Sequence, residues 1–546
     1  MLSRFTARPD GTLDLTTRVD LLRVPSERAC CHEAGSLAFG PDGTLFLSTG
    51  DNTDPFASEG RAPLDERPGR ETFNAQRTAG NPFDLRGKIL RINPDGSIPP
   101  GNAFPPDGSA GRPEVYIMGV RNPFRIAVDP LTGRLAWGDV GPDAVVDDRR
   151  GPRGFDEINV ADAPGRYGWP YCIADNRPYA DVDFATGSVG PAFVCDAFEP
   201  ATLFYDYLTV SHLALGNALS SEGPSAFTGR TAIAGVFSRR PAGDAPFALP
   251  PPWADTLLMT DWTRDVIAAV DVGPGRELRS VRRLLPWERF RRPVDLDTGP
   301  DGALYVLEYG TGFSGDNDDA ALSRVDYSTE GRLRPVAVLD ASTVAGAAPL
   351  AVTLSAEGSR AAGRGDALVG WHGDFDGDGR PDAEGPVVQR TFRRHGVYPV
   401  TLVVEGAIGG RSLPVSRQVI VGNAPPAVTV LDPADGVTVP RGRSVTFRGQ
   451  AIDPEDGTAA CGDLKWEIFL GHNAHAHPLG TQSGCSITWA VDPPPDHGDA
   501  ARLFYVVELV YRDRGGAGGE PPITGRQRVR VFVGEPSGSP GGAFVD

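Results

Sequence analysis

The sequence has no apolar run of the roughly 18 to 20 residues that a helix needs to span a bilayer, so we expect no transmembrane segment. It also has little positive charge, with 53 Lys and Arg against 71 Asp and Glu and a formal net charge of −18. Nucleic acids and anionic membranes attract basic patches, so this balance argues against a nucleic-acid partner and suits a secreted protein. No signal peptide is present, and Met1–Phe5 reads as the middle of a strand, which predicts that the natural N-terminus is missing.

Cysteine is scarce, with six residues in 546. Cys172 and Cys195 bracket one loop, and Cys461 and Cys485 bracket another. This placement is typical of disulfides in an oxidising compartment, which predicts a periplasmic or extracellular protein. The adjacent Cys30–Cys31 is open to two interpretations, a vicinal disulfide or two buried thiols.

Most of the chain alternates short apolar runs with turns rich in Gly, Pro, Asp and Asn, which predicts an all-β protein. One hairpin pattern recurs in residues 1–330, at Leu37–Thr49, Arg125–Trp137 and Val294–Leu307, with weaker copies at Gly87–Gly96 and Thr256–Val272. Repeated antiparallel units of this kind predict a β-propeller, with about five blades around a central channel.

The chain after residue 330 predicts two further domains. Residues 333–422 read as a short β-sandwich, Asn423–Pro426 as a linker and residues 427–535 as a second β-sandwich. The tail 536–546 is rich in Pro, Gly and Ser, so we expect it to be disordered.

A lone histidine stands directly before the first hairpin. His32 precedes the alternating run Leu37–Phe39, the turn Pro41–Gly43 and the second run Leu45–Thr49. Rigid strands would hold it at the mouth of the hairpin, where an imidazole can take a proton near neutral pH. The alternative is a histidine that only caps a strand.

Polar and Gly-Pro residues recur at the same end of successive hairpins, at Gly119–Arg125, Gly138–Asp143 and Gly154–Asn159, the last followed by Tyr167–Pro170. This recurrence predicts one shared face around the channel. The carbonyl groups of Gly141 and Pro142 offer ligands for a cation, and Arg121 offers a partner for a carboxylate. Plain turn chemistry with a surface arginine is the alternative for any one of these clusters.

The stretch from Asp374 to Asp382 has the DxDxDGxxD spacing of a calcium loop. Its expected ligands are Asp374, Asp376, Asp378 and Asp382. Gly379 permits the sharp turn, whereas the twelfth position is Gly385 and not the glutamate of an EF-hand. A plain acidic turn is the alternative, and a bound calcium here would be structural.

Four of the eight histidines lie close together in the sequence, at His472, His475, His477 and His497. Such a cluster could ligate zinc or copper. A polar loop on a sandwich edge is the favoured interpretation, because no spacing fixes an acidic or cysteine ligand.

At these motifs the chain resembles the pyrroloquinoline quinone (PQQ)-dependent soluble sugar dehydrogenases, the glucose/sorbosone dehydrogenase family. The resemblance covers residues 1–330 through the stretch Cys31–Asp51, RGKILRI, GVRNPFRI, FDEIN and GPDGALYVLEYG. It implies a six-bladed type of β-propeller whose first blade is missing here. Residues 333–422 resemble a PKD domain, and the last sandwich resembles an Ig-like module.

The resemblance also implies roles for individual residues. His32 would be the general base that takes the proton of the sugar C1 hydroxyl. Arg121 and Asn122 would hold carboxylates of the cofactor PQQ, and the carbonyls of Gly141 and Pro142 would ligate calcium. Further cofactor contacts are expected from basic residues, namely Arg264, Arg291 and Arg292. The family has aspartate where this chain has Cys31.

The implied function is quinone-dependent oxidation of an aldose at C1 to the lactone, with electrons passed to an external acceptor. The alternative is a non-catalytic extracellular propeller that binds carbohydrate or protein. A metal-dependent hydrolase is a third possibility, disfavoured because no acidic cluster stands at the hairpin mouths. The PKD-like and Ig-like modules would bind polysaccharide or serve as spacers.

Overall fold

The computed structural model describes residues 1–534 except 10, 28–30, 207–229, 241–244, 312–316, 318, 328–333, 364, 473–474 and 493–502. It divides into two compact units, the first made mainly of Met1–Val325 and the second of most of the chain after Val325. The described residues are almost entirely strands and loops, with the short 3-10 turns η1 (Glu71–Phe73), η2 (Ala75–Arg77) and η4 (Cys461–Asp463). No helix in this part of the chain is long and apolar enough to cross a membrane.

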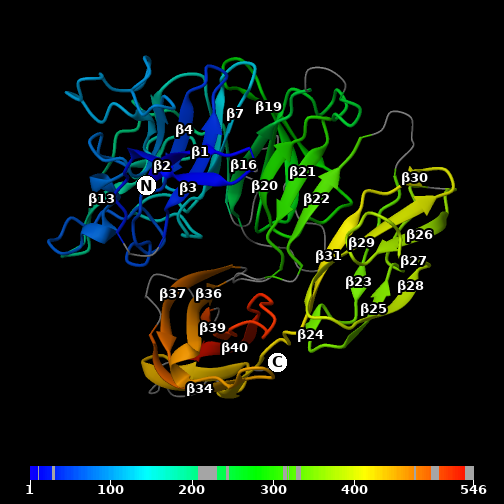
Figure 1. The fold of residues 1–546 in the computed structure, drawn as a ribbon. Coiled ribbons are helices and arrows are strands. Elements are labelled where there is room, and N and C mark those ends of the chain that lie inside the picture. Colours follow the sequence, from blue (N-terminus) through cyan, green and yellow to red (C-terminus); the bar gives the residue numbers. More distant parts are fainter. Residues whose placement is uncertain are drawn as a thin grey trace. The chain divides into compact units, whose positions relative to one another are not determined.

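The first unit contains four antiparallel sheets that follow one another in chain order, here named blades 1 to 4 (Figure 1). Blade 1 has β3 (Ala34–Phe39), β4 (Leu45–Thr49), β5 (Lys88–Ile92) and β6 (Val115–Met118), with the short β10 (Gly165–Arg166) parallel to β6. Blade 2 has β7 (Pro123–Val128), β8 (Leu135–Asp139), β9 (Asp156–Ala161) and β15 (Leu203–Tyr205). Blade 3 has β16 (Ala232–Phe237), β17 (Leu257–Asp261), β18 (Val266–Val272) and β19 (Leu278–Leu284). Blade 4 has β20 (Pro293–Thr298), β21 (Leu304–Glu308) and β22 (Ala321–Val325).

Neighbouring blades pack face to face, which explains why their strands are apolar on both faces. Their first strands touch in the order β3, β7, β16 and β20. The layer between blades 1 and 2 includes Phe46, Ile126 and Trp137, and the layer between blades 2 and 3 includes Ile158 and Met259. Blades 3 and 4 share a third apolar layer. The unit is therefore a β-propeller by architecture, although no comparable contact joins β20 back to β3 within the described residues.

The described part of the first unit forms four blades where the hairpin repeats predicted about five. The weak copy at Gly87–Gly96 is not a blade of its own, because β5 pairs with β4 inside blade 1, with Leu45 opposite Ile92. Alternation along a strand shows only that the strand lies in a sheet. It does not show to which sheet the strand belongs, and for this reason the sequence predicted one blade too many.

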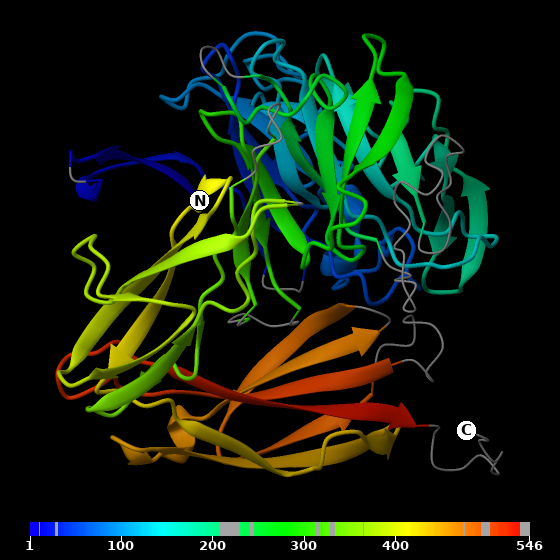
Figure 2. The same ribbon diagram turned by 90° about the vertical axis from the view of Figure 1, so that its right-hand side faces the viewer.

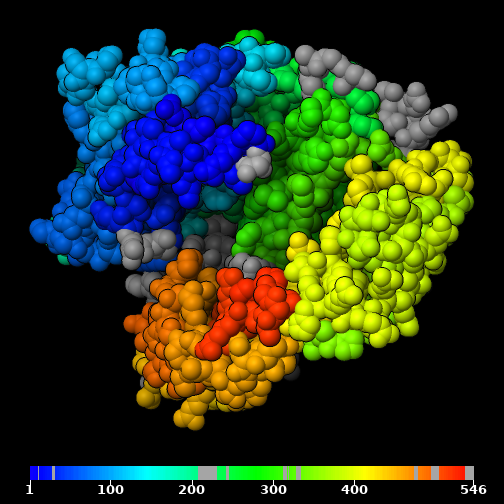
Figure 3. Space-filling view, in the orientation of Figure 1, coloured from blue at the N-terminus to red at the C-terminus, as the bar shows by residue number. Residues whose placement is uncertain are grey.

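Three hairpins complete the first unit. The pair β1 (Leu2–Ala7) and β2 (Leu13–Leu22) forms a two-stranded sheet separate from the blades, and most of its side chains are exposed or half-buried, except Leu22 (Figures 2 and 3). The long segment between β9 and β15 folds into β11 (Cys172–Ile173) with β12 (Arg177–Pro178), and β13 (Ala180–Asp183) with β14 (Ser188–Ala192).

The second unit begins with a β-sandwich of two sheets. One sheet contains β23 (Asp340–Ala341), β25 (Leu350–Ser355) and β28 (Val387–Phe392). The other contains β24 (Ala345–Gly346), β26 (Leu368–Asp374), β27 (Ala383–Glu384), β29 (Gly396–Gly406), β30 (Gly410–Arg411) and β31 (Val415–Val421). Val352 and Phe392 from the first sheet meet Val400 and Val419 from the second in one apolar core.

A second sandwich follows in the same unit. One sheet contains β32 (Ala427–Asp432), β34 (Arg443–Asp453), β35 (Gly457–Thr458) and β38 (Ser486–Val491). The other contains β33 (Val437–Pro440), β36 (Lys465–His472), β37 (His475–Ser483), β39 (Leu503–Arg512) and β40 (Thr524–Gly534). Its core includes Phe447, Trp466 and Val507, none of which is exposed.

Two disulfides confirm the placement of the cysteines. Cys172 is bonded to Cys195 in the segment between β9 and β15, and Cys461 is bonded to Cys485 in the second sandwich. Cys31 is also disulfide-bonded, whereas Cys30 lies outside the described residues. The described cysteines include no free thiol.

Candidate active site

The hairpin β3–β4 brings His32 and Asp51 together. His32 lies before β3 and Asp51 lies after β4, and the register of the hairpin sets Ala34 opposite Thr49. Backbone pairing continues past the strands, because the Asn52 amide donates to the His32 carbonyl at 3.0 Å. A side chain on Gly50 would meet that same carbonyl oxygen at 1.9 Å, so glycine is required where the histidine backbone crosses the strand end.

A chain of three hydrogen-bonded side chains holds the imidazole. The Nδ1 atom of His32 lies 2.8 Å from Oδ1 of Asp51, and Nε1 of Trp169 donates to Oδ2 of Asp51 at 2.7 Å. Asp51 and His32 are both buried. Because an ionised carboxylate only accepts, Nδ1 carries the proton and Nε2 keeps its lone pair. This tautomer is the one that a general base needs.

Charge and burial favour a neutral imidazole. Burial, assisted by the nearby charge of Arg121, lowers the pKa of His32, although Asp51 acts in the opposite direction. Burial alone would raise the pKa of Asp51, but its contacts with His32 and with the Thr53 amide bring that pKa below its usual value. The pair is therefore a neutral histidine beside a carboxylate, able to take a proton at neutral pH.

Arg121 and Asn122 are fixed beside this pair by their backbone. Asp139, at the end of β8, accepts the amide of Arg121 at 2.9 Å and the amide of Asn122 at 2.6 Å. Burial raises the pKa of Asp139 to about 7, although the hydrogen bonds from these two amides lower it. The guanidinium of Arg121 donates to the Val140 carbonyl at 2.8 Å and lies 5.8 Å from the ring of Trp169.

The turn Gly141–Pro142 is held by Asp156, the first residue of β9, and by Arg230, which precedes β16. The Gly141 amide donates to Oδ1 of Asp156 at 2.9 Å, and the Ala232 amide donates to Oδ2 of the same carboxylate at 2.7 Å. The buried guanidinium of Arg230 donates both to Asp156 and to the carbonyl oxygen of Pro142. Arg230 belongs to none of the motifs recognised in the sequence.

A narrow pocket, too tight to admit a water molecule, joins these groups, and its lining includes His32, Arg61, Arg121, Pro142 and Asp143. Residues expected together from the sequence, namely His32, Arg121 and Pro142, thus meet at one place. A larger pocket of about 270 Å³ lies between the start of β1 and the hairpin β3–β4, but no expected site residue lines it. The narrow pocket is the candidate site because the expected residues line it.

The other three expected cofactor arginines do not line this pocket. Arg264 is buried at the β17–β18 turn, where it donates to the Asp206 carbonyl at 2.7 Å and its guanidinium stands 4.9 Å from the Tyr205 ring. Arg291 and Arg292 precede β20, and the guanidinium of Arg292 lies 4.4 Å from the Trp262 ring.

Residues 3–203 match the family model for glucose/sorbosone dehydrogenases. The chain is 27% identical over 277 residues to an aldose sugar dehydrogenase, YliI, of Escherichia coli, which covers 50% of this chain and 57% of that protein. It is 31% identical over 186 residues to quinoprotein glucose dehydrogenase B of Acinetobacter calcoaceticus, covering 33% of this chain and 34% of that protein. The chain spans about half the length of the first curated relatives that it matches.

Among solved structures, the PQQ-bound aldose sugar dehydrogenase of Streptomyces coelicolor aligns with a TM-score of 0.35 and 19% identity, covering 59% of this chain and 71% of that one. The sequence of the N-terminal part of the first unit is thus homologous to the sugar dehydrogenases.

The site of this sugar dehydrogenase homologue fits an anionic cofactor by its donor chemistry. Two guanidinium groups and a neutral imidazole line one pocket, and the Oδ1 atom of Asn122, next in the chain to Arg121, is buried without a hydrogen-bond partner. Ligand pockets usually enclose about 300 to 1,000 Å³, and the space between these groups is far smaller, so a cofactor would lie against them and not inside the pocket.

Calcium does not fit at Gly141 and Pro142 as the resemblance implied. Calcium takes six to eight oxygen ligands at about 2.3 to 2.6 Å. The carbonyl of Pro142 already accepts from Arg230, and the Gly154 backbone is so close that a side chain there would meet that oxygen at 1.4 Å. No step of the chemistry is therefore derived through a metal at this turn.

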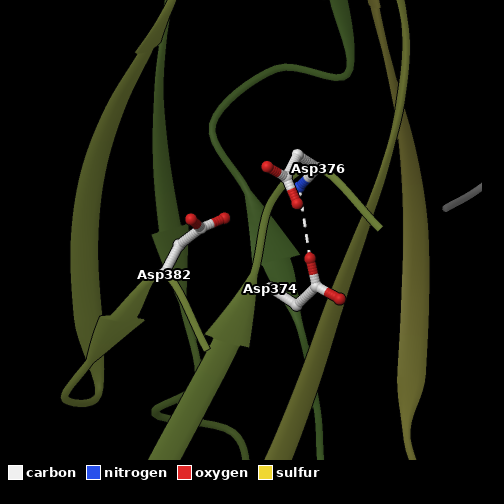
Figure 4. A group of neighbouring side chains, drawn as sticks. All are labelled: Asp374, Asp376 and Asp382. Atoms are coloured by element: carbon white, nitrogen blue, oxygen red, sulfur yellow. Dashed lines mark hydrogen bonds between the residues drawn. The ribbon is translucent and has the colours of Figure 1, made fainter. Parts of the chain in front are cut away.

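The acidic loop of the first sandwich gathers three of its four expected ligands. Oxygen atoms of Asp374, Asp376 and Asp382 lie within 4.8 Å of one another (Figure 4). Gly379 has φ +81°, as the sharp turn requires. Asp378 is not in this group, and its Oδ1 instead accepts the Arg380 amide at 2.8 Å. Of the histidine cluster, the side chains of His472, His475 and His477, and all of His497, lie outside the described residues.

Two functional positions were missed from the sequence, namely Asp51 and Arg230, and Trp169 lay in an expected cluster without an assigned role. Asp51 was accessible to sequence reasoning, because it is the first carboxylate after the strand that pairs with the His32 strand. The contact of Trp169 with Asp51 and the contacts of Arg230 carried no such signal, since each residue reaches the site from a segment distant in the chain.

Proposed function

We propose that residues 1–330 form a quinone-dependent sugar dehydrogenase domain that oxidises an aldose at C1 to its lactone. The observation that carries this proposal is the neutral imidazole of His32, oriented by Asp51 and Trp169 beside Arg121. Homology of residues 3–203 to glucose/sorbosone dehydrogenases supports the same reaction class.

In this reaction Nε2 of His32 takes the proton of the C1 hydroxyl, and Asp51 stabilises the imidazolium that results. PQQ, when bound, supplies an acceptor for the hydride that leaves C1 and later passes the two electrons to an external acceptor. Arg121 and Asn122 would hold its carboxylates, because their backbone is fixed by Asp139 and Arg121 carries a permanent charge. Arg264, Arg291 and Arg292 lie on blades 3 and 4 and would contact parts of the cofactor outside the pocket.

The second unit is proposed to consist of a PKD-like module over residues 333–422 and an Ig-like module over residues 427–535. Calcium at Asp374, Asp376 and Asp382 would stabilise the first of them. These modules would hold the dehydrogenase domain on polysaccharide or space it from a surface. The two disulfides favour export to the periplasm or the extracellular space.

The test is titration of the purified protein with PQQ, followed by aldoses and a dye acceptor. His32→Gln is expected to bind the quinone as the parent does and to lose turnover by about 10²-fold or more, because the general base is gone. His372→Gln is the matched control, since His372 lies in β26 of the other unit. Full turnover by His32→Gln would refute the assignment of the base. Absence of quinone binding to the parent would leave the binding scaffold as the function.

A further inference from the structure

Arg230 occupies the position at which the resemblance places a divalent cation. Its side chain is 1% exposed, and its two terminal nitrogens donate to Asp156 and to the carbonyl oxygen of Pro142. A guanidinium remains charged at every pH at which the protein is folded. The carbonyl of Pro142 therefore already faces a permanent cation.

Asp156 connects the Arg230 guanidinium to the backbone of the turn. One oxygen of Asp156 accepts the Gly141 amide and the Arg230 guanidinium, and the other accepts the Ala232 amide at the start of β16. The same carboxylate thus connects the turn after β8 with the first strand of blade 3. A buried carboxylate of this kind requires a positive partner, and Arg230 is that partner.

Space and charge both oppose a metal ion at the same carbonyl. A side chain on Gly154 would meet Pro142 O at 1.4 Å and a terminal nitrogen of Arg230 at 2.4 Å, so these groups fill the volume around the oxygen. A divalent ion bound there would also lie beside the guanidinium in a buried setting, where like charges repel strongly.

We propose that Arg230 replaces the divalent cation at the Gly141–Pro142 turn, so that this domain takes up its anionic quinone without calcium. The inference rests on the proposed function for the identity of the cofactor. The replacement of a metal by an internal arginine does not depend on the cofactor, because it is inferred from the contacts of Arg230 alone. Arg230 is a positioning residue, because the contacts described for it are with protein atoms.

The experiment uses the full chain with Asp374→Asn and Asp376→Asn, which removes the other candidate calcium loop. In this background, PQQ affinity measured by tryptophan quenching is expected to agree within about twofold in excess calcium and in excess chelator. Loss of affinity in chelator with recovery in calcium would overturn the inference. Absence of quinone binding under both conditions would instead refute the proposed function.

A second measurement needs no quinone. Calcium is expected to leave the Tm of the Asp374→Asn, Asp376→Asn background unchanged, because the Pro142 carbonyl already accepts from Arg230. Adding Arg230→Met exposes the Asp156 carboxylate and the Pro142 carbonyl, so calcium should now raise the Tm, whereas Arg230→Lys should behave as the parent. A calcium-dependent rise in Tm with Arg230 intact, abolished by Asp156→Asn, would overturn the inference. If Arg230→Met does not fold, the comparison of the background with and without calcium decides alone.

Discussion

The imidazole of His32 owes its character to two residues that hold it. Asp51 sets the tautomer through Nδ1, and Trp169 fixes the second oxygen of Asp51. Burial keeps the imidazole neutral, while Asp51 keeps its pKa from falling further. Reactivity at this site is therefore a property of the hydrogen-bonded chain and not of histidine alone.

Asp51→Asn tests this arrangement. The asparagine cannot favour the Nδ1–H tautomer in the same way, so we expect kcat to fall by about 10-fold or more. Asp51 raises the pKa of His32, so its loss should lower that pKa and move the acid limb of kcat/KM to lower pH. The measurement is a pH profile of both constants.

Glu33→Gln is the matched control for that profile, because it removes an exposed carboxylate beside His32 that bonds only to Ser26 in the part of the chain described. It should leave kcat and the acid limb unchanged. A limb that moves to higher pH in Asp51→Asn would contradict the electrostatic account.

At the scale of elements, a buried lysine secures the long insertion between β4 and β5. The Nζ atom of Lys88 donates to the carbonyls of Thr78, Ala79 and Arg86 at 2.8, 3.1 and 2.8 Å, and the residue is not exposed at all. An ammonium has three donors on one atom, which matches three carbonyls that converge on a point. Only Lys88 and Lys465 are lysines in this sequence, so arginine serves at the other basic positions.

Lys88→Met should therefore destabilise the first unit by about 2 to 5 kcal/mol, because it leaves buried carbonyl groups without donors. Lys88→Arg is expected to destabilise as well, since its planar guanidinium does not match this geometry. Lys465→Met, at a half-exposed position, is the control and should change stability by less than about 0.5 kcal/mol. Urea unfolding measures all three. Equal stability of Lys88→Met and its control would contradict the role of the ammonium.

The disulfide Cys172–Cys195 also stabilises the first unit at the scale of elements. It closes a loop with a sequence separation of 23 in the segment that also carries Trp169 near its start. Replacing both cysteines by serine should lower the free energy of unfolding by about 2 to 4 kcal/mol, because the unfolded loop regains its entropy. Thermal unfolding of the variant and the parent measures this, both without reductant, so that the other disulfides stay intact in the two proteins.

At the scale of the whole molecule, the second unit has cores of its own. Each of its two sandwiches encloses an apolar cluster drawn from both of its sheets. Unit 2 is therefore expected to fold without the propeller.

Expression of residues 326–534 tests this expectation together with the calcium loop. The fragment should unfold cooperatively, and calcium should raise its Tm. Asp374→Asn with Asp376→Asn should abolish the calcium effect and keep the cooperative transition, because the loop lies outside the core. Near-ultraviolet circular dichroism follows both. A fragment without fixed tertiary structure would show that the two units depend on each other.

Much of the architecture follows from local patterns. Alternation and turn residues predicted the all-β class and hairpins such as Leu37–Thr49, because a strand with side chains of period two needs only its neighbours in the chain. His32, Arg121 and Pro142 were expected at one site because they stand at the same end of successive hairpins. The number of blades was not predictable, since alternation in β5 does not show that it pairs with β4.

The sequence by itself determined the class of fold, the loops that cysteines bracket, and the meeting of Arg121 and Pro142 with His32, whereas the structure decided that Cys172 pairs with Cys195 and Cys461 with Cys485. Only the tertiary structure decided how that site is charged. Trp169 reaches Asp51 across 118 residues of chain, and Arg230 reaches Pro142 across 88. Both contacts arise from the packing of blades and insertions on one another, which depends on long-range burial and leaves no periodic trace in the sequence.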